Sequence, residues 1–92
     1  MNTNELVDVI IKECGPLLKE PGAFENAYSI VGRVRRALGR NLPKLDRPPM
    51  TREEAERYAG AYIGRRNTRQ GYTMLIGDEE RVREDFITAL TT

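Results

Sequence analysis

Apolar residues recur at the three- and four-residue spacing of an α-helix in four separate stretches of this chain. The first stretch predicts a helix over residues 3–14, because Asn2 and Glu5 have the spacing of a capping box and a broad apolar arc follows them. Residues 9–11 alone would also suit a strand, but the cap and the helical period favour the helix. The glycine and proline at 15–16 end it.

The second helix is predicted over residues 23–38, where the helical spacing is most regular, and Gly39 is its expected end. Residues 41–50 contain three prolines and therefore predict an ordered loop or an extended connector. The apolar side chains of this connector are expected to hold it against the core; they are Leu42, Leu45 and Met50.

The third helix is predicted to begin at a second capping box, Thr51 with Glu54, and to end at Gly64. A polar, basic loop is expected over residues 65–71. A last helix is predicted to start at Asp78, because acidic residues follow it and interact favourably with the dipole of a helix first turn.

Residues 72–76 are the best strand candidate, since aromatic and β-branched residues lie there between two glycines. One strand alone is not stable, so this strand needs a partner. That partner can be residues 61–66, which would make 67–70 a hairpin turn and would shorten the third helix. Alternatively, 72–76 is an extended connector that packs on the core.

These elements predict one domain over residues 1–92, because a chain this short builds a single small core. The fold class is mainly α, with about four helices around that core and a short strand or β-hairpin near residues 61–76. If the hairpin forms, the fold is a small α+β fold.

The composition excludes several kinds of chemistry. The chain has no histidine and a single cysteine, Cys14, which excludes histidine-dependent triads, structural zinc sites and an internal disulfide. Helix capping and the helix dipole explain the clusters of carboxylates. We therefore expect no enzyme activity, no metal, no cofactor, and a buried, inert thiol at Cys14.

A cytoplasmic location is expected. The first residues lack the positive segment and the long apolar segment of a signal peptide, and no apolar run reaches the roughly 18 residues of a membrane span. The single cysteine favours a reducing compartment. The partner is therefore expected to be a macromolecule and neither a membrane nor a small-molecule substrate.

The arginines are concentrated in two basic islands, although the net charge is only +1. The first island lies between Glu25 and Asp46 and the second between Glu56 and Asp78, and neither interval contains an acidic residue. Arginine binds phosphate or carboxylate through two parallel hydrogen bonds, which lysine cannot form. The islands are therefore the best functional signal in the chain.

The first island places Arg33, Arg36 and Arg40 within about 60° of one another on the predicted helix, opposite its apolar stripe. Such a face can follow a phosphate backbone or dock on an acidic protein, and it can equally be a solvated surface paired with neighbouring acids. Arg35 falls at the edge of the apolar face. There its stem packs while its head reaches water, or it meets a carboxylate from another element.

The second island lies in the predicted loop between two tyrosines, and binding residues concentrate on loops. Tyrosine and arginine are enriched at interface hot spots, and tyrosine can stack on a base. The alternative is a hydrophilic turn with buried tyrosines. The candidate partner contacts of this island are Arg65, Arg66, Asn67, Arg69, Tyr62 and Tyr72.

These patterns predict a non-catalytic interaction protein that binds and occludes a protein or nucleoprotein partner through its arginine islands. Small phage or mobile-element inhibitors of host nucleic-acid machinery have this general character. The competing prediction is a direct DNA- or RNA-binding regulator, acting alone or as a dimer. The near-neutral net charge argues against a dedicated non-specific DNA binder, which gains affinity from a large positive field.

Overall fold

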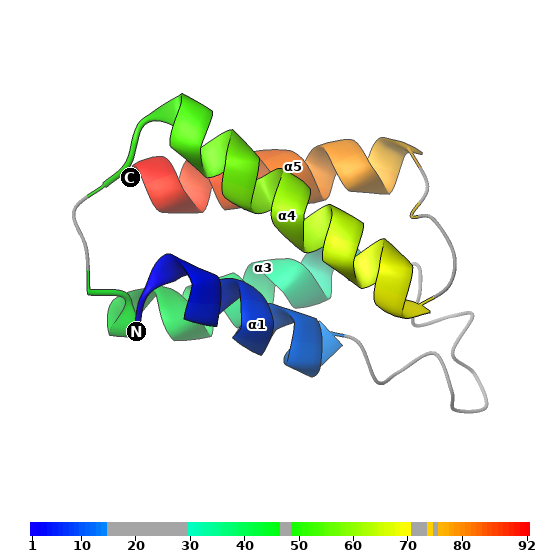
Figure 1. Cartoon of the computed structure of the whole chain (residues 1–92), viewed down its shortest axis with the longest axis horizontal. Coiled ribbons are helices and arrows are strands. Elements are labelled where there is room, and N and C mark those ends of the chain that lie inside the picture. Colours follow the sequence, from blue (N-terminus) through cyan, green and yellow to red (C-terminus); the bar gives the residue numbers. More distant parts are fainter. Residues whose placement is uncertain (15–29, 47–48, 71–73, 75) are drawn as a thin grey trace.

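The described part of the chain is built from helices (Figure 1). The computed structural model describes residues 1–14, 30–46, 49–70, 74 and 76–92. No strand occurs among these residues, and a short 3-10 turn, η2 (Leu42–Lys44), follows the second of the described helices. Within these residues the four α-helices are α1 (Thr3–Cys14), α3 (Ile30–Asn41), α4 (Arg52–Gln70) and α5 (Ile76–Thr91).

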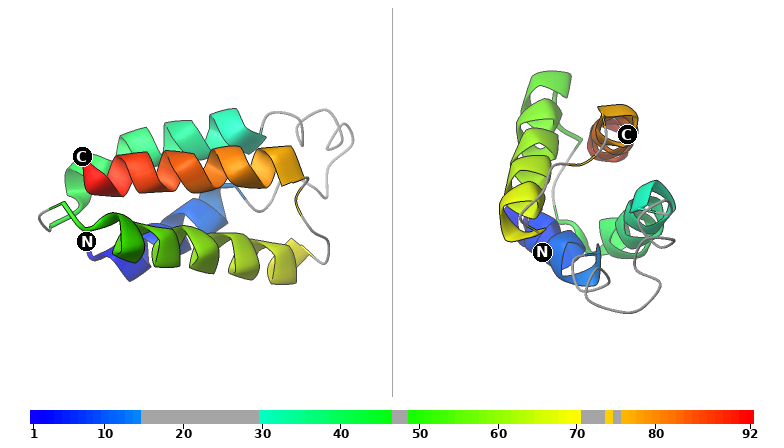
Figure 2. Two further views of the ribbon diagram at one scale, coloured as in Figure 1. Left: turned by 90° about the horizontal axis from the view of Figure 1, so that it is seen from above. Right: turned by 90° about the vertical axis from the view of Figure 1, so that its right-hand side faces the viewer.

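The helices pack as a bundle in which α1 contacts α3 and α4, and α5 contacts the same two helices. The end-on view of Figure 2 shows α1 and α5 at opposite corners of a quadrilateral. The contact between α4 and α5 is the most extensive of the four. Both ends of the chain lie at the same end of the bundle (Figure 1). The mainly α fold class predicted from the sequence is thereby confirmed.

Two predicted caps start their helices as expected. The Asn2 Oδ1 accepts a hydrogen bond from the backbone N–H of Glu5 at 2.8 Å, and α1 has the predicted bounds. The Thr51 Oγ1 accepts from the N–H of Glu54 at 3.3 Å at the start of α4. Each cap satisfies one of the backbone donors that the first turn of a helix leaves without an intrahelical partner.

Two helices continue past the glycines at which the sequence predicts their ends. α3 runs past Gly39 to Asn41, whose buried side chain donates to the carbonyl of Ala37 at 2.8 Å. α4 runs past Gly64 to Gln70. A glycine inside a helix costs only about 1 kcal/mol relative to alanine, and the contacts of the following turn offset that cost.

The predicted loop at residues 65–71 and the predicted hairpin are wrong in their first part, because residues 61–70 belong to α4. Residues 71–73 and 75 lie outside the described residues, as does the 23–29 part of the second predicted helix. The last helix, α5, begins two residues before the predicted cap, so Asp78 lies in its first turn.

The core lies between the four helices and centres on a pair of stacked rings. The rings of Tyr62 in α4 and Phe86 in α5 have centroids 4.8 Å apart, and neither side chain is exposed to solvent. The connector between α3 and α4 is held to this core as the sequence predicts. Leu42 and Leu45 are partly buried against it, and the buried Met50 donates its backbone N–H to a carbonyl at the end of α5.

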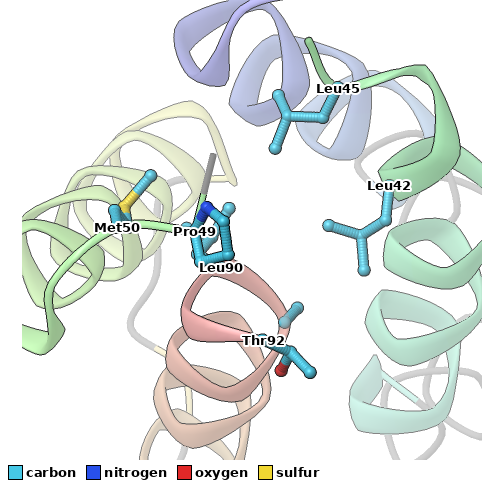
Figure 3. A pocket seen from close by; sticks show the side chains of 7 residues that line it. Leu42, Leu45, Pro49, Met50, Leu90 and Thr92 are labelled. Atoms are coloured by element: carbon cyan, nitrogen blue, oxygen red, sulfur yellow. The ribbon is translucent and has the colours of Figure 1, made fainter. Parts of the chain in front are cut away.

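A small cavity lies at the end of the bundle where the connector meets the last turn of α5 (Figure 3). Its volume is about 220 Å³, below the roughly 300–1,000 Å³ that small-molecule sites occupy, so it supports no ligand assignment. The lining residues are Leu42, Leu45, Pro49, Met50, Ala89, Leu90 and Thr92.

The helical placement of Gly64 can be tested by substitution. A Cβ added at Gly64 meets no atom within 4 Å, so Gly64→Ala should raise the free energy of unfolding by roughly 0.5–1 kcal/mol. Urea denaturation measures this change. Gly39→Ala in α3 has the same open surroundings and should behave alike. A loss of stability in Gly64→Ala would instead indicate a left-handed helix end at this position.

Candidate interaction surface

Arginines from each of the two islands lie on opposite flanks of α1. Arg40 of α3 forms an ion pair with Glu13 of α1, with Nη2 and Oε2 2.9 Å apart. On the other flank, Arg65 of α4 forms an ion pair with Asp8 of α1. Residues that are far apart in the sequence are thus gathered around one short helix. We call this region the α1 surface; its basic residues are Lys12, Arg33, Arg36, Arg40, Arg65 and Arg69. Arg36 is included by its position on the helix, since it lies three residues after Arg33 and four before Arg40.

On the flank toward α3, Glu13 organises several side chains. Its backbone carbonyl accepts from Arg33 Nη2 at 3.1 Å, and its carboxylate pairs with Arg40. The buried Asn41 places its amide 3.4 Å from both carboxylate oxygens. Arg36 is exposed and forms no ion pair with any other described residue. Arg33 and Arg40 are therefore partly engaged within the protein, and Arg36 is directed to solvent.

On the flank toward α4, a shallow groove of about 340 Å³ follows the last turns of that helix. It is lined by Ile11 of α1 and by four residues of α4: Gly64, Arg65, Thr68 and Arg69. The side chain of Arg65 is 53% exposed although it pairs with Asp8. Arg69 is also exposed, and within the described ranges it has no ion-pair partner. We call this feature the α1/α4 groove.

Two residues of the predicted second island lie in the core and not on the surface. Tyr62 is fully buried, and Arg66 is only 4% exposed. Residues four apart share one side of a helix, so the extension of α4 turns both side chains inward. Arg66 donates from Nη1 to Asn67 Oδ1 at 2.9 Å, and the backbone N–H of Met74 donates to the same oxygen at 3.2 Å. The prediction of a solvated loop is therefore wrong for residues 65–70. The alternative with buried tyrosines is right for Tyr62, whereas the burial of Arg66 is not predicted from the sequence.

The other predicted contacts are placed as follows. Asn67 is partly buried and joins the end of α4 to the segment before α5 through the bond to Met74. Tyr72 lies outside the described residues. Arg35 takes the second of its two predicted alternatives, because its Nε lies 2.7 Å from Asp85 Oδ2 of α5. Arg35 is thus part of the link between α3 and α5, away from the α1 surface.

The carboxylates of α1 are the residues that sequence reasoning misses. Asp8 and Glu13 each lie beside an arginine of a different helix, yet nothing local in the sequence relates them. The available signal is their position on α1, since both fall off its apolar arc. Which arginine each one meets depends on the order of the helices around the bundle, and that order is a tertiary property.

The only described thiol and one tyrosine hydroxyl lie together in the interior. Cys14 is buried, as predicted, and burial raises the pKa of its thiol above the usual value. Burial also raises the pKa of the neighbouring Tyr62 hydroxyl. No described atom makes a hydrogen bond of normal geometry with that hydroxyl. Because both groups stay protonated at neutral pH, the thiol is a poor nucleophile.

The division between buried and exposed arginines predicts a difference in stability. Arg66→Ala should lower the free energy of unfolding by roughly 1–3 kcal/mol, because it leaves a void and removes a donor to Asn67. Arg69→Ala, at an exposed position of the same helix, should change it by no more than about 0.5 kcal/mol. Equal effects in chemical denaturation would contradict the burial of Arg66.

The buried pair predicts a loss of stability at alkaline pH. Folding raises the pKa values of Cys14 and Tyr62 from 9.0 and 10.0, so the unfolded chain loses these protons first. This contribution to stability is complete below about pH 9 and is lost as the pH rises through the higher folded-state values. Thermal unfolding between pH 8 and 11 should show it.

Tyr62→Phe isolates the tyrosine part of that effect. The variant should be at least as stable as the parent at neutral pH, because an unsatisfied buried hydroxyl costs about 1–3 kcal/mol. It should also lose less stability than the parent above pH 10. An unchanged alkaline profile would show that the Tyr62 hydroxyl ionises equally in the folded and unfolded chain.

Similarity assigns no function to this chain. Among the described helices, none combines the length and the apolar character needed to cross a membrane. No family model, curated protein or solved structure shows a significant match to this protein. Any function must therefore be argued from the α1 surface itself.

Proposed function

We propose that this chain is a non-catalytic interaction protein that binds the acidic surface of a protein or nucleoprotein partner through the α1 surface. The observation that carries the proposal is the convergence of the two arginine islands on the flanks of α1. Arg40 reaches Glu13 on one flank, and Arg65 reaches Asp8 on the other. The partner would be occluded where these arginines hold its acidic side chains.

The ion pairs of the α1 surface support this proposal, since they are open to exchange. The side chains of Arg65 and Asp8 are each about half exposed, and that of Arg40 is 67% exposed. Exposed ion pairs contribute only about 0–1 kcal/mol to stability. A carboxylate of a partner can therefore replace Asp8 at little cost, and the guanidinium retains a planar, two-pronged contact.

The distribution of acids favours a protein partner over a bare nucleic acid. Glu5, Asp8 and Glu13 lie on α1 between the arginines of α3 and those of α4. A continuous phosphate backbone that crosses from one flank to the other would pass these carboxylates. Separate acidic side chains of a protein can contact the arginines of each flank without passing the carboxylates of α1. The net charge of +1 also gives little long-range attraction for a polyanion.

Charge reversal at exposed arginines tests the proposal. Arg36→Glu and Arg69→Glu each change one flank of the α1 surface, at exposed positions that form no ion pair with another described residue. The double variant should keep its melting temperature within a few degrees, because exposed substitutions change stability by about 0.5 kcal/mol or less. It should also lose a partner that the parent captures from a lysate of the native host.

The matched control is the double variant Arg57→Glu and Arg81→Glu, which has the same charge but changes exposed positions away from α1. This control should retain the partner, with or without nuclease treatment of the lysate. Equal loss in both double variants would show a general charge effect and contradict the proposal.

A salt titration with a DNA duplex and an RNA tests the competing function. A direct binder with about five phosphate contacts should give a log–log slope near −4 to −5 on B-DNA. Retention with that slope, together with loss of capture after nuclease treatment, would replace the proposal with direct nucleic-acid binding. No retention at low salt would remove that competitor.

A further inference from the structure

We propose that the α1/α4 groove is a subsite for one acidic side chain of the partner, whose carboxylate lies between Arg65 and Arg69. This inference rests on the proposed function, since it names the ligand of one flank of the same surface. The groove brings together two guanidinium groups, a hydroxyl and an apolar floor on two packed helices. That combination matches a glutamate side chain, which is apolar along its stem and charged at its end.

Two residues make the floor of the groove apolar: Ile11 through its side chain, and Gly64 because it has none. Ile11 is 4% exposed and contributes its side chain from α1. Gly64 contributes no side chain, and a Cβ built there would meet no atom within 4 Å. The glycine therefore keeps the groove open beside the arginines, although an alanine would suit the helix better. The methylene groups of a glutamate can lie in this space.

The charged wall of the groove consists of Arg65 and Arg69. They are four residues apart, so their side chains lie one above the other on the same side of α4. Thr68 adds little positive character, because its hydroxyl donates to the carbonyl of Gly64 at 2.9 Å. The attraction for an anion therefore comes from the two guanidinium groups, each of which can form parallel hydrogen bonds with a carboxylate.

Asp8 occupies part of this site from within the chain. Its carboxylate pairs with Arg65, so this guanidinium can donate to a carboxylate in the conformation it adopts here. The pair is about half exposed on both sides, so a partner carboxylate can displace Asp8.

A peptide titration tests the ligand directly. The probe is a capped pentapeptide with one glutamate between two leucines, and the control probe has glutamine in its place. The Nε–H resonances of Arg65 and Arg69 are followed by NMR in the intact protein. Both should shift with the glutamate peptide and neither with the glutamine peptide. Equal shifts with both peptides, or none with either, would overturn the carboxylate subsite.

Variants of the groove test its geometry. Gly64→Leu fills the floor of the groove, so the stem of the glutamate can no longer lie there. The affinity for the glutamate peptide should therefore fall at least about tenfold. Gly39→Leu places the same side chain on open α3 surface and should bind like the parent. The two variants should both remain folded, because each glycine has open space around it. Equal binding by Gly64→Leu and the parent contradicts the proposal.

Substitution of Asp8 tests the competition within the chain. Asp8→Asn should strengthen peptide binding about two- to fivefold, since it removes a weak, exposed ion pair that occupies Arg65. Glu5→Gln makes the same change in net charge at another exposed position of α1. It should strengthen binding less. An equal gain in both variants would mean that only the net charge matters and would overturn the role of the groove.

A titration with inorganic phosphate tests whether the groove prefers a phosphate to a carboxylate. If phosphate shifts Arg65 and Arg69 at lower concentration than the glutamate peptide does, the groove is a phosphate site and the proposal is wrong. The outcomes also separate the two levels of the argument. A peptide that fails to bind while the Arg36→Glu and Arg69→Glu variant still loses its partner removes the subsite and leaves the proposed function. If the glutamate peptide binds but the parent protein captures no partner that the Arg36→Glu and Arg69→Glu variant loses, the subsite stands and the proposed function is removed.

Discussion

The helical phase of α4, unbroken across Gly64, decides which arginines of the second island face solvent. Tyr62 and Arg66 lie four residues apart and turn together toward the core, where Tyr62 stacks on a ring of α5. Arg65 and Arg69 form the corresponding pair on the side toward α1. If the chain left the helix at Gly64, this division would not exist. The α1 surface would then lose its α4 flank, and the core would lose the buried stem of Arg66.

α1 carries both flanks because its acids point to two different neighbours. Asp8 and Glu13 are five residues apart, which places them about 140° apart around the helix axis. One therefore reaches α4 and the other reaches α3, the two helices that α1 contacts. Exposed ion pairs add little to stability, so their effect is mainly to hold the arginines in place. The stability itself comes from the apolar interior between the helices.

Local signals in the sequence predict the starts of α1 and α4 and the burial of the connector well. The caps at Asn2 and Thr51 depend on neighbouring backbone donors, and the connector leucines depend on simple burial, so both follow from short stretches of chain. The predicted helix end at Gly64 is wrong for a tertiary reason, because contacts made by the following turn outweigh the low helix propensity of glycine. The pairing of Asp8 with Arg65 is equally beyond local reasoning, because it requires α1 and α4 to be neighbours.

The same pairing explains how an arginine-rich surface can coexist with a net charge near zero. At distances longer than the spacing of these charges, the acids of α1 offset much of the field of the arginines around them, and salt screens the remainder beyond a Debye length of about 8 Å. At contact distance the guanidinium groups still offer directed hydrogen bonds. A polyanion approaching at random therefore gains little. A partner gains only if its acidic side chains match the positions that Asp8 and Glu13 already occupy, and this requirement makes such a surface selective rather than merely basic.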